Sequence, residues 1–254
     1  MYFSYMKTRA IRLPAAVTVA GIVIFIFLAG CASPSKVVVA SGYKKQFAID
    51  ASLAVVILDE APSVIYFGDV KKSLKLPIER DGDTSASSIR FMVWDYFKER
   101  LTRDIVREID VKAAFIAPVK HNYLVTKEFF KTRDEDVIVE IPDKKTRFTF
   151  DSTEASHVLF LDKIRIGTET DAYYADRAEQ GLYTTTPRKL LYLASFVLWD
   201  NRELKHICYG RVKATVPIIR EEATAEDWEE VSRNFVRTIF EPTGFVKRED
   251  GKSF

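Results

Sequence analysis

The chain has 254 residues, of which 47% are hydrophobic and 29% are charged, a balance typical of a folded protein with a buried core. This composition excludes the disordered, collagen-like and low-complexity classes. The formal net charge is +2, but Lys7, Arg9 and Arg12 all lie in the first thirty residues, which contain no acid. The remainder carries 35 basic and 36 acidic side chains. It therefore lacks the positive surplus that nucleic-acid binding usually needs.

The N-terminus has the order of a secretory signal: three positive charges, an apolar run over residues 15–29 without a charge, and then Leu28-Ala29-Gly30-Cys31. Fifteen helical residues span about 22 Å, which is short of the roughly 30 Å hydrocarbon core of a bilayer. We therefore predict a signal peptide over residues 1–30. A permanent transmembrane helix is the weaker interpretation.

The tetrapeptide Leu28-Ala29-Gly30-Cys31 resembles the lipobox of bacterial lipoproteins. This resemblance implies cleavage between Gly30 and Cys31 and acylation of the Cys31 thiol, which becomes the first mature residue. Each buried methylene contributes roughly 0.8 kcal/mol, so two or three acyl chains would hold the protein on a membrane almost irreversibly. Ala32, in place of Asp at the second mature position, implies the inner face of the outer membrane, with the inner membrane as the alternative. The only other thiol, Cys208, is left without a partner for an intrachain disulfide.

Residues 31–50 mix Ser, Pro, Gly and Lys and predict a tether after the lipidated cysteine, followed by a single periplasmic domain over residues 51–246 and a polar tail over 247–254. The domain begins with an uninterrupted apolar run, Leu53–Leu58, which is typical of a strand buried on both faces. A second short strand is expected over 64–67. From residue 88 apolar residues recur at helical spacing as far as Ile109, and residues 111–118 return to strand character. Strand, helix and strand predict a right-handed crossover with a parallel pair.

The second half of the domain predicts mostly strands. Short strands over 137–141 and 147–150 flank a turn at Pro142, and a longer strand covers 157–166. Residues 189–216 predict a hairpin that turns at Asp200, and an amphipathic helix capped by Thr224 ends near Pro242. The fold class is therefore α/β, with α+β as the alternative, built on a mixed sheet with packed helices.

Three acids offer the nearest approach to a catalytic site. Asp59 and Glu60 follow the first strand, and Asp162 lies in the 157–166 strand on the side of Phe160 and Ile164. The ends of strands are where α/β folds place ligands. Turn capping or a surface ion pair explains these acids better, so an envelope hydrolase or ligand-binding protein using them is the alternative to a non-catalytic protein.

Metal and cofactor signals are weak. His121, His157 and His206 lie on separate segments, and only His206 and Cys208 share one strand, where alternation places both on the same face. A core or half-buried position explains this pair better than a metal. Without a phosphate-cradling glycine loop or a metal motif, we expect no cofactor and no metal.

Residues 167–188 form a polar stretch of about twenty residues between two strong strands, longer than compact folds normally use. It carries Tyr173, Tyr174 and Tyr183, the residue type that protein interfaces favour. We expect these tyrosines either to contact a protein partner or to lie on their own domain.

The order of elements, and the segment Leu198-Trp-Asp-Asn-Arg-Glu-Leu-Lys-His-Ile207 in particular, resembles the α/β domain of envelope lipoproteins related to the curli secretion-channel family and to the lipoprotein activators of cell-wall synthases. In those proteins an Asp opens the turn of a shared hairpin, and the usual turn has a Gly where this chain has Arg202-Glu203. The resemblance implies a non-catalytic, membrane-tethered binding or assembly subunit with an envelope protein as partner, which is also compatible with a homo-oligomeric ring.

Deletion of residues 170–185 tests the role of the tyrosine-bearing stretch. We expect a thermal midpoint close to that of the wild type, because the stretch is polar, together with loss of partner capture in pull-downs from intact envelopes. A large drop in the midpoint would instead assign these residues to the core.

Overall fold

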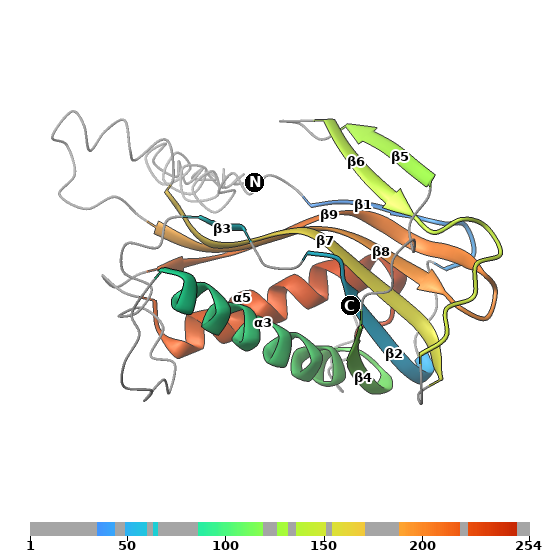
Figure 1. Cartoon of the computed structure of the whole chain (residues 1–254), viewed down its shortest axis with the longest axis horizontal. Helices are drawn as coiled ribbons and strands as arrows, with labels where there is room; N and C mark the ends of the chain where they lie inside the picture. The colour runs from blue at the N-terminus through green and yellow to red at the C-terminus, as the bar shows by residue number, and fades with distance from the viewer. Residues whose placement is uncertain are drawn as a thin grey trace, which may run out of the picture. The chain divides into compact units, whose positions relative to one another are not determined.

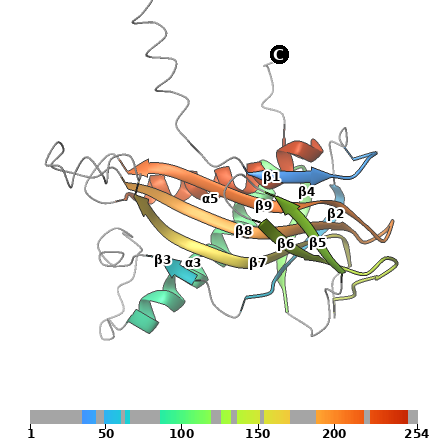
Figure 2. The ribbon, with the colours of Figure 1, turned by 90° about the horizontal axis from the view of Figure 1, so that it is seen from above.

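The computed structural model describes residues 35–43, 49–59, 63–65, 86–118, 126–131, 136–150, 154–170, 188–218 and 223–247. They belong to one compact unit, Pro34–Phe254. Its centre is a 7-stranded mixed sheet in the order β1-β9-β8-β7-β2-β4, with β3 paired to β7. Helices α3 and α5 lie together on one face of this sheet, and the hairpin β5-β6 lies on the other (Figures 1 and 2). The predicted α/β class with a mixed sheet is confirmed.

The strand-helix-strand unit forms as predicted. Strand β2 (Ile49–Ile57) pairs in parallel with β4 (Val111–Ala117), and the helix α3 (Ala86–Glu108) connects them in the chain. Strand β2 also pairs in parallel with β7 (Ala155–Thr170), which places it inside the sheet. Its apolar run is continuous because alternate residues enter two separate cores: Leu53 and Val55 face the helices, whereas Ala54 and Val56 face the opposite side. The short strand β3 (Ser63–Ile65) joins β7 farther along.

The second half of the sheet is antiparallel. Strand β8 (Arg188–Asp200) pairs with β7 and with β9 (Lys205–Ile218), which confirms the predicted hairpin. Helix α5 (Ala225–Phe240) begins at Thr224, whose hydroxyl accepts a hydrogen bond from the Asp227 N–H in a capping box. It ends in the 3-10 turn η1 (Glu241–Thr243). Its buried stripe includes Trp228, Phe235 and Ile239, which pack on β8 and β9.

Two expectations for the outer face were wrong. Strand β6 (Asp136–Ile141) pairs with β5 (Thr126–Lys131), and residues 147–150 form no strand beyond an isolated bridge residue, Phe150. This segment instead crosses the face opposite the helices, where Phe148 packs edge-on against Phe160 and Trp199. Burial of its aromatic side chains replaces the strand pairing that alternation predicted.

The predicted tether over residues 31–50 is also corrected in part. Lys36–Val39 form β1, which pairs antiparallel with β9, and Tyr43 is buried. Gly210 permits this pairing, because a Cβ at that position would lie 2.1 Å from the Lys36 carbonyl oxygen. Ile49 then opens β2. At the other end, the Lys247 N–H donates to the Glu108 carbonyl, so the predicted tail begins with a residue held by the fold.

A buried ion pair joins the two helices beneath the sheet. Arg100 Nε donates to Asp104 Oδ2 at 3.0 Å, and Arg100 Nη1 donates to Glu229 Oε1 at 2.9 Å across to α5. Asp104 is fully buried and Arg100 nearly so. Asp104 Oδ1 finds no partner among the described residues. The Arg100 guanidinium is therefore the main counter-charge of this carboxylate.

Replacing Arg100 with Met should lower the free energy of unfolding by about 3–5 kcal/mol, because it leaves Asp104 buried without its counter-charge. Arg103→Met is the matched control: Arg103 is an exposed arginine of the same helix, paired only with Glu99, and its loss should cost less than about 1 kcal/mol. Urea denaturation measures both. Equal losses would refute the role of the buried pair.

Candidate functional site

The predicted acids meet at a bulge in β7. The pairing of β7 with β8 shifts register between Asp162 and Arg165, and Lys163 adopts the left-handed conformation with φ 53°. Asp59 Oδ2 accepts a hydrogen bond from the Ile164 N–H at 2.5 Å, and Asp162 Oδ1 accepts one from the Lys163 N–H at 2.8 Å. Burial raises the pKa of Asp59, and the negative charge of Asp162 adds to that rise, while the hydrogen bond from Ile164 opposes it.

This geometry assigns the two carboxylates to the bulge itself, since both accept main-chain N–H groups there. The expectation that Phe160 and Ile164 share a face was wrong: the bulge turns Ile164 toward the helices, whereas Phe160 packs on the opposite side. Glu60 lies outside the described residues. Within the part of the chain that the structure describes, no three His, Cys, Asp or Glu side chains gather in a group that could hold a metal ion.

A second bulge separates His206 from Cys208. His206 lies opposite Trp199 in the register and its ring lies 5.3 Å from that of Tyr209 on the outer face. Cys208 lies opposite Leu198 and is fully buried on the helix side, where desolvation raises the pKa of its thiol far above the ordinary value. The prediction that these two side chains share a face was wrong because the register shifts between Leu198 and Trp199.

The remaining predicted site residues lie outside the described residues. These are Gly30 and Cys31 of the lipobox and the tyrosines Tyr173, Tyr174 and Tyr183. His121 lies outside them as well. Among the described helices none is both long and apolar enough to span a membrane.

A buried polar network surrounds the turn between β8 and β9. Asp200 Oδ1 accepts the N–H groups of Arg202 and Glu203, and its Oδ2 accepts the Tyr43 hydroxyl at 2.8 Å. His157, opposite Asp200 in the register, shares a 2.7 Å hydrogen bond between its Nδ1 and Ser156 Oγ. Ser156, His157 and Asp200 are all buried, so this serine-histidine-aspartate grouping serves the packing of the sheet end.

Burial lowers the pKa of His157 to about 4, and the nearby Asp200 only partly opposes this effect. The neutral imidazole is thus favoured in the folded state, whereas an unfolded histidine titrates near 6.5. The contribution to stability is complete above pH 6.5 and is lost as the pH falls toward 4, where the unfolded chain takes up the proton first.

We expect the free energy of unfolding to fall by about 2 kcal/mol between pH 7.5 and pH 5 through this group alone. His157→Phe should remove that part of the pH dependence, and His206→Phe should retain it. Urea titrations at the two pH values compare the three proteins. An unchanged slope in His157→Phe would contradict the assignment.

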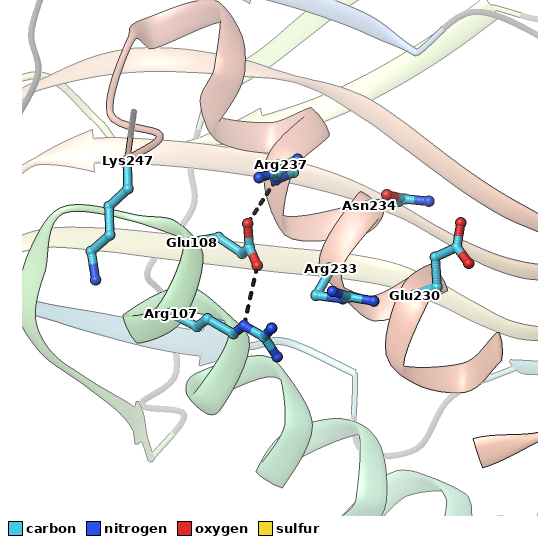
Figure 3. Close-up of a pocket in the computed structure, with 7 residues that line it drawn as sticks. All are labelled: Arg107, Glu108, Glu230, Arg233, Asn234, Arg237 and Lys247. Atoms are coloured by element: carbon cyan, nitrogen blue, oxygen red, sulfur yellow. Dashed lines mark hydrogen bonds and ion pairs between the residues drawn. The ribbon is translucent and has the colours of Figure 1, made fainter. Parts of the chain in front are cut away.

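A charged hollow of about 430 Å³ lies between the two helices. Figure 3 shows Arg107 and Glu108 entering it from the last turn of α3, and side chains of α5 facing them. We call it the α3–α5 hollow. Four of its lining residues are cationic, two are acidic and one is an amide: Arg107, Arg233, Arg237 and Lys247; Glu108 and Glu230; and Asn234.

One carboxylate organises the cations of the α3–α5 hollow. Glu108 Oε2 accepts from Arg237 Nε at 2.6 Å, and Glu108 Oε1 lies 3.7 Å from Arg107 Nε. Lys247 Nζ donates to the Val106 carbonyl oxygen at 2.7 Å. The sequence marks Arg233 and Arg237 only as cations suited to the negative end of a helix dipole. Nothing in the spacing indicates that two helices far apart in the chain would bring their arginines together.

Neither the family models nor the curated proteins contain a match to this chain. Among solved structures, the PelC dodecamer from Paraburkholderia phytofirmans matches in two crystal forms. The TM-scores are 0.33 and 0.31 at 9% and 10% sequence identity, and each match covers 83% of this chain and 98% of the other. A neuraminyllactose-binding hemagglutinin homolog from Helicobacter pylori matches with a TM-score of 0.23 at 14% identity, covering 77% of this chain and 85% of the other. At TM-scores below 0.5 these likenesses assign neither a family nor a function.

Proposed function

We propose that this chain is an exported lipoprotein, anchored through acylated Cys31, that acts as a non-catalytic binding or assembly subunit in the cell envelope. The observation that carries the proposal is the lipobox Leu28-Ala29-Gly30-Cys31 directly after a charged segment and an apolar run too short to span a bilayer. Ala32 favours the periplasmic face of the outer membrane by its resemblance to sorted lipoproteins.

The start of the fold supports a close membrane attachment. The Ser35 hydroxyl donates to the Lys213 carbonyl and accepts from the Lys213 N–H, so residue 35 is already fixed on β9. Only residues 32–34 separate it from Cys31. Four Cα–Cα steps span at most about 14 Å, so an acylated Cys31 would hold the sheet edge within that distance of the lipid.

The bulge at β7 supports the non-catalytic part of the proposal. A hydrolase using Asp59 and Asp162 needs a carboxylate free to exchange a proton with substrate. Both carboxylates instead accept N–H groups of the bulge, and neither lines the α3–α5 hollow. Their positions fit the capping role that the sequence favoured for them.

Membrane fractionation of Cys31→Ser tests the anchor. We expect the wild-type chain in the membrane fraction, with a mature N-terminus at Cys31 and a mass increased by acyl chains, and the variant released from membranes. Cys208→Ser is the matched control, because Cys208 is buried and cannot carry a lipid; it should remain in the membrane fraction. An unprocessed N-terminus with a bare thiol would refute the proposal.

A further inference from the structure

We propose that the α3–α5 hollow is a binding site for a small oxyanion, a phosphate or carboxylate group carried by a soluble ligand. This inference concerns the folded unit alone and does not depend on the lipid anchor. It rests on the charge that remains in the hollow, on one unpartnered arginine atom, and on the position of the hollow in the fold.

The charges of the hollow do not cancel. Its four cations face two carboxylates. Glu108, only 8% exposed, holds Arg237 directly and lies beside Arg107, which fixes both guanidinium groups at the rim and leaves the hollow with a net positive charge. Planar arginine forks of this kind match the two oxygens of a carboxylate or phosphate.

Arg233 supplies an independent sign of a missing acceptor. Its Nε is buried and has no hydrogen-bond partner among the described residues, although the side chain lines the hollow. A buried charged donor without an acceptor is costly. An oxyanion in the hollow would provide that acceptor and offset the surplus charge in a single step. The volume of about 430 Å³ lies within the range of small-molecule sites.

The position of the hollow favours a soluble ligand over a lipid headgroup. The hollow begins where α3 ends, and the Asp110 carbonyl that follows accepts the Ile49 N–H at the end of the sheet where β2 starts. Lys205, at the start of β9, lies at this same end through its pairing with Asp200. Ser35 joins β9 beside Lys213, eight residues or about 26 Å along that strand. The anchor therefore enters the fold away from the hollow.

Isothermal titration calorimetry on the purified full-length chain in detergent tests the site, with inorganic phosphate and with citrate as probes. We expect binding with a Kd of about 1 mM or tighter for at least one probe. Arg233→Gln should weaken it by about tenfold or more, because a charge-assisted donor is lost. Arg107→Gln, an exposed position at the rim, should weaken it as well and serves if Arg233→Gln fails to fold.

Two controls complete the experiment. Arg103→Gln removes an exposed arginine of α3 that lies outside the hollow and should leave the affinity unchanged. The Cys31→Ser protein is also sedimented with phosphatidylglycerol vesicles. Absence of binding by both probes, or equal affinity in Arg233→Gln and wild type, would overturn the site. Vesicle binding that depends on Arg233 without phosphate binding would overturn the soluble-ligand assignment.

Discussion

The five-residue turn from Asp200 to Leu204 is the constraint on which the rest of this fold depends. Asn201 donates to the carbonyls of Phe148 and Ala155 and accepts the Phe148 N–H, so one buried amide satisfies three main-chain groups of two other segments. Asp200 holds its own turn and the Tyr43 hydroxyl. The outer layer, the start of β7 and the segment after β1 are therefore fixed by two adjacent side chains. Such buried networks stabilise a fold only when every member is satisfied.

This turn also shows how a resemblance in sequence can be correct in chemistry and different in detail. Asp200 opens the hairpin as the resemblance implied. The left-handed conformation falls on Leu204, with φ 54°, and not on a glycine. A side chain at such a position costs on the order of 1 kcal/mol. The Asp200 and Asn201 hydrogen bonds hold the turn in place against that cost.

The elements that the sequence predicts well are those with long, uniform periodicity. The stripe of α5 and its Thr224 cap, the continuous apolar run of β2 and the β8-β9 hairpin each carry one repeated signal over many residues. The failures are local. A bulge adds one residue and exchanges the faces of everything beyond it, which is why Phe160 and Ile164, and His206 and Cys208, lie on opposite sides. Alternation in a sequence contains no sign of where that extra residue falls.

Strand β1 failed for a different reason, because its pairing depends on a residue far away. Lys36–Val39 is a short Val-rich segment amid Ser, Pro and Gly, and by itself it reads as a tether. It becomes a strand because Gly210 leaves room for its backbone on β9 and because Ser35 bonds to Lys213. The α3–α5 hollow has the same origin: Glu108 and Arg237 are separated by 129 residues and meet only in the folded chain. Contacts of this range set both the short reach to Cys31 and the charge of the hollow, so the two features that bear most on function are those that local sequence signals carry least.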